Sequence, residues 1–425
     1  MRVLVCDDIA DRQDEVVQRI LDAGQPRPEA ITGDALSAEL TQLFKSARQS
    51  LADPKSFADR DSRFHDVDLV ILDNNLTHLP GDGPLLTAES IAGYIRTFTN
   101  AKYVVSLNAN LDVDFDLRFL VGDFSSRADL ALNTPHLTNP SLWSGNVAAA
   151  VNGFLPWYWP RLEESPGRRR AQIEFVTKHL DDPIMQALGF ESSVVNLLSL
   201  HAKGALSPVA VADGEPSANS RPIDKITFRD VFIAKDRSLP IKADREMFSK
   251  SEEANDGHLR EVLARVVAAD IDMWFRRDIT GPQEALLDIP HLLMRFPFFL
   301  GERVSVAEEW NKVLLAGTAP YGLEEQLYEQ HLAKARFEHD EWVKTACFRW
   351  PVLRDDEDLN KRFLTIKEGD WPDVVFCEDR SQFIALSDQK AKPVEFTAEF
   401  EGSWARRYIA RIDGVRYAPL TRLAE

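Results

Sequence analysis

Continuous apolar runs that end in acidic residues mark the first third of the chain. Residues 69–72 run directly into Asp73, and residues 3–6 are followed by Asp7 and Asp8. Runs of this length and composition are typical of strands buried on both faces of a parallel sheet. Because ligands of open α/β sheets bind at the carboxyl ends of the strands, we expect these carboxylates to gather at that edge.

Amphipathic stretches alternate with these apolar runs. The expected helices cover residues 11–21, a stretch around 36–44 and residues 88–98, and further strands cover residues 103–107 and 129–132. Alternating strands and helices imply βαβ units and a parallel sheet with helices on both faces. The pattern therefore predicts a doubly wound α/β domain over residues 1–150.

The apolar pattern changes to helical spacing after residue 150, and residues 151–365 are expected to be mainly helical. The expected helical stretches are 171–203, 258–277 and 321–348, with Asp270 and Asp272 facing solvent or capping a salt bridge. Residues 203–222 are rich in Ala, Gly, Ser and Pro and are predicted to be a mobile loop. The aromatic stretch 154–160 is interpreted as a hinge, with a ligand-stacking surface as the alternative.

Short strands are expected from residue 366 to residue 425. Asp413–Gly414 is typical of a hairpin turn between residues 407–412 and 415–420. Closely spaced short strands favour a small β-barrel, and the end of the chain weakly resembles SH3-like barrels. The whole chain is thus expected to be multidomain, as its 425 residues also suggest.

Composition narrows the classes of function. The net charge of −18 argues against a general nucleic-acid binder, and the short run Arg168–Arg170 is interpreted as a solvated helix start. The apolar stretch 289–300 is too short and too interrupted to span a bilayer. The residues from position 2 are expected to form a strand rather than a signal peptide. Three cysteines without zinc or disulfide spacing suit a cytoplasmic protein.

Four segments together resemble the receiver domain of bacterial response regulators. They are residues 3–8, residues 68–73, the loop 80–83 and residues 104–109. The resemblance covers about residues 1–150 and implies a flavodoxin-like fold. It also implies phosphorelay signalling, with a histidine kinase or a downstream effector as protein partner and a homodimer as a further possibility.

The resemblance also implies roles for individual residues. Asp73 would accept a phosphoryl group, while Asp7, Asp8 and the backbone carbonyl of Asn75 would hold Mg²⁺ together with Asp73. Asn108 or Ser106 would occupy the position of the switch residue. A carboxylate and a phosphoryl donor are both anionic, so a hard cation with oxygen ligands is needed between them.

Two departures from the receiver pattern leave alternatives open. Asn133 and Thr134 precede Pro135, where receivers carry a lysine, and an insertion is expected within residues 25–62. The leading hypothesis is an atypical response regulator. The alternatives are a phosphorylation-independent pseudo-receiver that docks or dimerises, and an enzyme in the helical region that the receiver gates.

Overall fold

The computed structural model describes most of the chain. The described residues are 1–53, 62–65, 67–79, 86–108, 113, 115–121, 126–138, 142–143, 167–206, 222–235, 257–305, 307–314, 322–367, 371–388, 390–394 and 404–418. The aromatic stretch 154–160 and most of the expected mobile loop lie outside them. The first four residues of that loop belong to a helix, α8 (Leu200–Leu206).

A five-stranded parallel sheet forms the N-terminal part of the molecule. Its strands are β1 (Val3–Cys6), β2 (Glu29–Ile31), β3 (Leu69–Asp73), β4 (Tyr103–Leu107) and β6 (Leu130–Leu132). The strand order is β2-β1-β3-β4-β6, and every neighbouring pair is parallel. This order is that of flavodoxin-like sheets, so the predicted α/β domain is confirmed at the level of its sheet.

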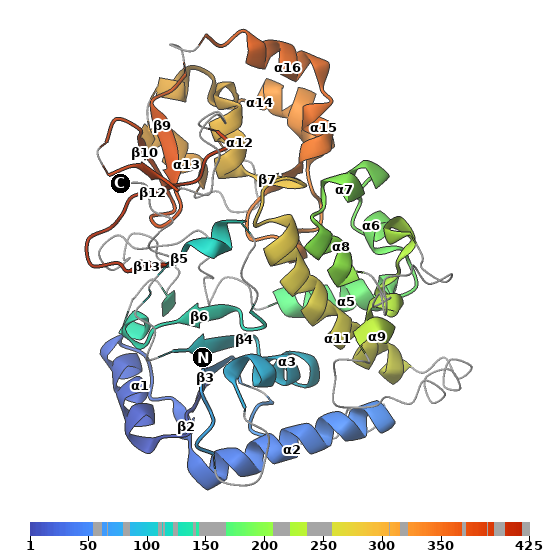
Figure 1. The fold of residues 1–425 in the computed structure, drawn as a ribbon, viewed down its shortest axis with the longest axis vertical. Coiled ribbons are helices and arrows are strands. Elements are labelled where there is room, and N and C mark those ends of the chain that lie inside the picture. The colour runs from blue at the N-terminus through green and yellow to red at the C-terminus, as the bar shows by residue number, and fades with distance from the viewer. Residues whose placement is uncertain are drawn as a thin grey trace.

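Helices cover both faces of this sheet (Figure 1). Helix α1 (Ala10–Asp22) packs on one face, and α2 (Gly33–Ala52) and α3 (Ala88–Phe98) pack on the other. Helix α3 starts at a capping box in which Thr87 and Ser90 bond each other's backbone. Residues 25–62, where an insertion is expected, include the 20-residue α2, which extends the expected helical stretch around 36–44. They also include the short strand β2, which the sequence pattern did not reveal.

The middle of the chain is mainly helical, as expected, but its helices are shorter. They are α5 (Arg168–His179), α6 (Ile184–Ala187), α7 (Ser192–Leu197), α8, α9 (Phe228–Lys235), α11 (Gly257–Trp274) with a π-turn over Phe275–Ile279, α12 (Ile289–Arg295), α13 (Ala307–Leu314), α14 (Glu325–Leu327), α15 (Trp350–Arg354) and α16 (Glu357–Leu364). Helix α11 is the centre of this region and packs against α5, α9 and α3. It therefore joins the helical region to the N-terminal sheet.

The prediction of one helix over residues 321–348 is wrong. The helix α14 ends at Leu327, a π-turn (Tyr328–Leu332) and a 3₁₀ turn (Ala333–Ala335) follow, and the chain then extends. A second 3₁₀ turn (Asp340–Trp342) precedes β8 (Cys347–Arg349), which pairs antiparallel with β7 (Leu286–Asp288). Pairing with a strand about sixty residues away has overridden the local helical pattern.

The C-terminal strands form an open sheet rather than the expected barrel. Strands β9 (Val374–Cys377), β10 (Gln382–Ala385), β11 (Lys392–Pro393) and β12 (Tyr408–Ile409) have the order β10-β9-β12-β11, and the described strands do not close into a barrel. The turn at Gly414 exists, with φ of 82°. However, the strand after it, β13 (Tyr417–Ala418), does not return to β12.

Strand β13 instead pairs in parallel with β5 (Phe115–Asp116), which belongs to the first third of the chain. The rings of Phe115 and Tyr417 meet at this pairing at an interplanar angle of 53°, and both residues are buried. A short 3₁₀ turn (Leu117–Val121) follows β5, and another (Thr134–Thr138) follows β6. Backbone hydrogen bonds between β13 and β5 therefore join the C-terminal part of the described chain to its first third.

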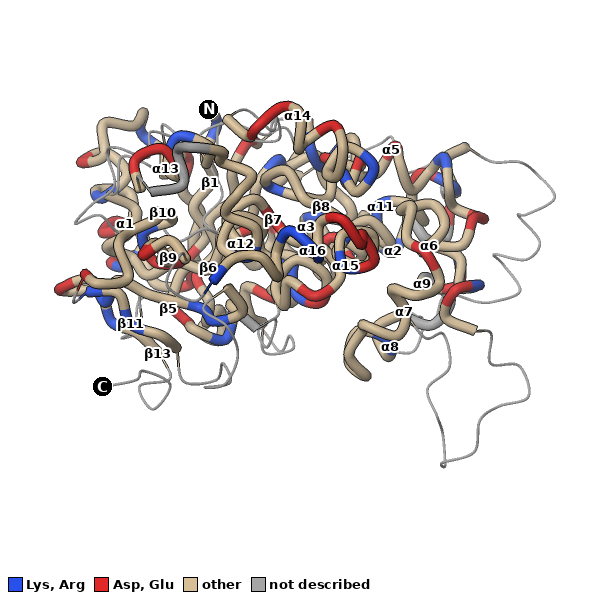
Figure 2. The backbone as a smooth tube through the Cα atoms, turned by 90° about the horizontal axis from the view of Figure 1, so that it is seen from above, with Lys and Arg blue, Asp and Glu red and all other residues tan. Residues whose placement is uncertain are grey.

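Two hydrophobic cores run across the expected domain boundaries. One combines α2, α3 and the sheet with α5 and α11, and the other combines α1 and the opposite face of the sheet with α12 and β9. The apolar stretch 289–300, which is too short to span a bilayer, lies in the second core. Acidic and basic residues are interspersed along the described chain (Figure 2). None of its helices is long and apolar enough to cross a membrane.

Candidate metal centre

Three carboxylates meet where the strand order of the sheet reverses. Asp7 and Asp8 follow β1, and Asp73 is the last residue of β3, which pairs with β1 in the register Cys6 with Leu72. Because β2 and β3 lie on opposite sides of β1, this edge is the topological switch point of the sheet, the position at which ligands of open α/β sheets bind. The strand pattern alone therefore places the three predicted site residues together.

The three carboxylates are close and shielded from solvent. Each contributes an oxygen to a group whose members lie within 4.8 Å of one another. The residues Asp7, Asp8 and Asp73 are 2%, 9% and 5% exposed. Buried like charges at this separation repel, and a hard divalent cation with oxygen ligands would remove that repulsion.

Backbone hydrogen bonds orient each carboxylate. The amide of Ile9 donates to Asp7 at 2.8 Å, and the amide of Asn75 donates to Asp73 at 3.2 Å. The amide of His78 donates to Asp8 Oδ2 at 2.7 Å, and its ring Nδ1 lies 3.2 Å from the same oxygen. The other oxygen of Asp8, Oδ1, is buried without a hydrogen-bond partner in the described structure, so it is placed to ligate a cation.

The surroundings of the cluster shift its proton affinity. Burial, followed by the neighbouring charge of Asp7, raises the pKa of Asp73 to about 6. Burial also raises the pKa of Asp7, with Asp8 adding to the effect. Arg12 of α1 lowers both pKa values, but its contribution is smaller than that of burial. A cation that favours the charged carboxylates therefore competes with protons here.

The two candidates for the switch position lie on β4 and just beyond it. The hydroxyl of Ser106 is 3.4 Å from the side-chain oxygen of Asn74, which follows Asp73 directly. Asn108 donates its backbone amide to Leu132 on β6. Ser106 thus contacts the loop after Asp73 more directly than Asn108 does. Among the described residues, no contact places the backbone carbonyl of Asn75 in the acidic cluster.

The position after the last strand carries no lysine. Asn133 and Thr134 are buried directly after β6, and they begin the 3₁₀ turn that contains Pro135. The cation whose charge reaches Asp7 and Asp73 is Arg12, which lies on α1 instead. The folded chain therefore has no lysine at the position after β6 where receivers carry one.

Two contributors to the cluster were not predicted from the sequence. His78 lies in the loop after β3, and its contact with Asp8 spans 70 residues. Arg12 lies at the start of α1, where a basic residue is common on any solvated helix. No spacing rule in the sequence connects either residue with the carboxylates, so only the folded structure reveals their contribution.

A second group of charges lies in the helical region. Asp270 and Asp272 are 8% and 6% exposed, so they do not face solvent, and the salt-bridge alternative holds. Arg276 lies 3.1 Å from Asp272, and Arg127 lies 4.0 Å from Asp270. Burial raises the pKa of Asp272, but Arg276 and Arg96 hold that pKa below its usual range. Arg168 begins a helix as expected, but it bonds the carbonyl of Glu341 rather than being fully solvated.

Comparison with known proteins identifies no matching family model, no matching curated sequence and no matching solved structure. What the chain shows by itself is a flavodoxin-like parallel sheet with helices and an acidic cluster at its switch point.

Proposed function

We propose that the N-terminal domain is an atypical receiver that binds Mg²⁺ and accepts a phosphoryl group on Asp73. The observation that carries this proposal is the buried group of Asp7, Asp8 and Asp73, in which Asp8 Oδ1 is left without a partner. An acidic cluster of this kind is costly to bury unless it has a ligand. The set of oxygen donors fits a hard cation such as Mg²⁺.

The chemistry of this site follows from charge. When bound, Mg²⁺ would supply the positive charge that lets an anionic phosphoryl group approach a carboxylate. An oxygen of Asp73 would form a bond to phosphorus, while the bond to the donor breaks and the leaving group takes up a proton. Histidine kinases carry such a phosphoryl group on a ring nitrogen, so a histidine kinase is the proposed donor.

The output would pass through α3, which follows the Asp73 strand and contacts α11. Arg265 of α11 donates to the carbonyl of Thr99 at 3.0 Å and to the side chain of Asn100 at 3.1 Å, just beyond the end of α3. A charge change at Asp73 that shifts α3 would therefore alter its packing on the helical region. A downstream protein would read that change.

Thermal unfolding with Mg²⁺, with and without beryllofluoride, tests the proposal on the wild type, Asp73→Asn and a matched control, Asp22→Asn. Beryllofluoride mimics an aspartyl phosphate. We expect the melting temperature of the wild type and of Asp22→Asn to rise, because a ligand at one hundred times its Kd stabilises the native state by about 2.7 kcal/mol. The shift should vanish in Asp73→Asn, and a flat response of the wild type would overturn the proposal.

A pseudo-receiver is the second candidate, and the missing lysine before Pro135 favours it specifically. In that case the acidic cluster binds a cation or nothing, and the domain serves as a docking or dimerisation surface. Stabilisation by Mg²⁺ without any further effect of beryllofluoride would support this candidate. The third candidate, an enzyme gated by the receiver, is favoured by a cavity lined with titratable groups where the helical region meets the two sheets.

A further inference from the structure

A cavity lies between the N-terminal sheet, the helical region and the C-terminal sheet, away from the acidic cluster. It has a volume of about 120 Å³, several times the space that one water molecule needs. Its walls come from the start of β6, the end of α11 with its π-turn, the segment before β8 and the ends of β7 and β9. The cavity is therefore built from segments that only the tertiary fold brings together.

Cationic side chains outnumber carboxylates in the described lining of this cavity. The cations are Arg168, Arg276, Arg277, Lys344 and Arg407, and the carboxylates are Asp129, Asp288 and Glu378. This excess contrasts with the net charge of −18 of the whole chain. A surplus of positive charge in a concave site is expected to attract anions.

The carboxylates of the lining are already engaged by other groups. Asp129 pairs with the buried Arg96. Asp288 and Glu378 both contact His291, and Glu378 also accepts a hydrogen bond from Arg407. Arg96, His291 and Arg407 therefore balance these acids. Arg276 and Arg277 are balanced by Asp272 and Asp278, which lie outside the described lining.

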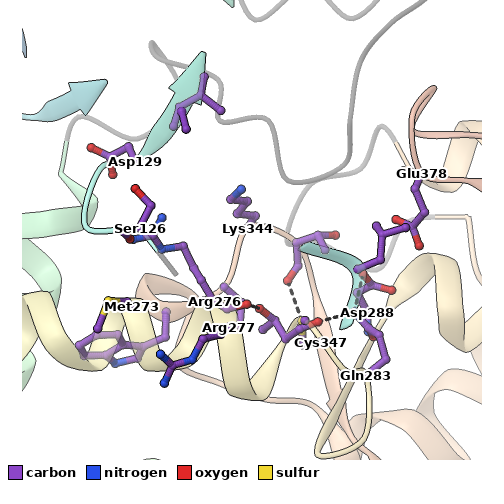
Figure 3. A pocket seen from close by; sticks show the side chains of 18 of the residues that line it. Ser126, Asp129, Met273, Arg276, Arg277, Gln283, Asp288, Lys344, Cys347 and Glu378 are labelled. Atoms are coloured by element: carbon purple, nitrogen blue, oxygen red, sulfur yellow. Dashed lines mark hydrogen bonds between the residues drawn. The ribbon is translucent and has the colours of Figure 1, made fainter. Parts of the chain in front are cut away.

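Figure 3 shows Arg276 and Arg277 on one side of the cavity, Asp288 and Glu378 on the other, and Lys344 between them. Arg276 is held by Asp272 and by the carbonyls of Ser126 and Ala128, so its position is fixed. The contact of Arg168 is with the carbonyl of Glu341, at 3.1 Å from its Nε. Arg168 therefore keeps guanidinium N–H groups with which to bind a ligand.

Lys344 stands between the two walls. Its side chain retains exposed surface because it projects into the cavity, yet burial, followed by the charges of Arg276 and Arg168, lowers the pKa of Lys344 to about 7. An ammonium group that is destabilised by neighbouring cations gains from an anion placed beside it. The same geometry suits a group with several anionic oxygens more than a single carboxylate.

We propose that this cavity binds a small molecule that carries a phosphate group, with Lys344 and Arg168 as its direct contacts. Arg276, Arg277 and Arg407 line the same cavity, and each is paired with a carboxylate. This site is separate from the acidic cluster and does not depend on phosphorylation of Asp73. A ligand bound by Lys344 and Arg168 joins the segment before β8 to the start of α5.

Calorimetric titration of the full chain with inorganic pyrophosphate tests this site, with EDTA present to exclude binding through Mg²⁺. We expect binding by the wild type and a loss of at least about tenfold in affinity for Lys344→Met, since a charge-assisted contact is removed. Lys344→Arg should restore most of the affinity. Lys361→Met removes an exposed lysine of α16 and should bind as the wild type does.

Two further variants test the second direct contact and the independence of this site from the acidic cluster. Arg168→Gln should also weaken pyrophosphate binding by about tenfold. Asp73→Asn should leave it unchanged, so this test can succeed or fail independently of the beryllofluoride experiment. Absence of binding by the wild type, undiminished binding by Lys344→Met, or loss of binding in Asp73→Asn would each overturn the proposal, provided that the variants keep the wild-type melting temperature without ligand.

Discussion

Asp73 is the residue whose protonation should report most directly on the acidic cluster. Its pKa is raised to about 6, so the folded protein binds its proton more tightly than the unfolded chain does. A raised carboxyl pKa lowers the free energy of unfolding as pH rises from about 4 through 6. Ionisation of Asp73 therefore destabilises the metal-free protein at neutral pH.

Replacement of Asp73 by Asn should accordingly stabilise the metal-free protein. We expect Asp73→Asn to exceed the wild type in free energy of unfolding by about 1 kcal/mol at pH 8, once solvent screening is allowed for, and to match it near pH 3.5, where Asp73 is protonated in both the folded and the unfolded chain. Urea unfolding with EDTA at the two pH values measures this difference. The same difference at both pH values would show that the Asp73 proton is not its cause.

An ion pair adds to the hydrophobic packing that attaches helix α3 to the sheet. Arg96 of α3 is 3% exposed and bonds both the carboxylate of Asp129 and the carbonyl of Arg127. Asp129 also accepts a hydrogen bond from the amide of Val104 at 2.8 Å. The pair thus links a helix, a central strand and the start of β6.

Removal of Arg96 should be strongly destabilising, because it leaves the mostly shielded carboxylate of Asp129 partly unpaired. We expect Arg96→Met to lower the free energy of unfolding by about 3–5 kcal/mol. Urea unfolding should also show that the double variant Arg96→Met with Asp129→Asn loses less than the two single changes added together. Arg19→Met removes only a surface pair with Glu15 and should cost no more than about 0.5 kcal/mol.

Elements that follow local patterns were predicted well, and elements that depend on distant pairing were not. The strands β1, β3, β4 and β6 are continuous apolar runs, and α11 carries one long apolar stripe. By contrast, β8 falls in a stretch predicted to be helical, because its pairing with β7 is invisible in the local sequence. The pairing of β13 with β5, which lies in the first third of the chain, has the same origin.

The described chain behaves at the largest scale as one packed unit. Each hydrophobic core contains residues of the N-terminal sheet together with residues beyond position 170. Separation of the N-terminal part would expose the sides of α3 and the sheet that these cores cover. We therefore expect stability to be shared across the chain rather than divided among independent domains.

Differential scanning calorimetry of the full chain checks this expectation. One cooperative transition, with matching calorimetric and van't Hoff enthalpies, is expected in metal-free buffer. A fragment of residues 1–150 should unfold at a lower temperature than the full chain, because it lacks the packing of α11 against α3. Separate transitions in the full chain, one of them matching the fragment, would contradict a shared core.

The sequence alone determined the acidic cluster. Parallel strands end at a common edge, so apolar runs that stop at Asp7, Asp8 and Asp73 bring these carboxylates together without any long-range information. It also determined the absence of lysine before Pro135. Both results follow because a strand and the residue after it are adjacent in the chain.

Only the tertiary structure decided the rest. His78 reaches Asp8, Arg96 of α3 reaches Asp129, and Lys344 enters a cavity formed by segments that lie far apart in the sequence. Their positions depend on how the helices pack and on which distant strands pair. Such contacts result from burying many side chains at once, so no local pattern specifies them.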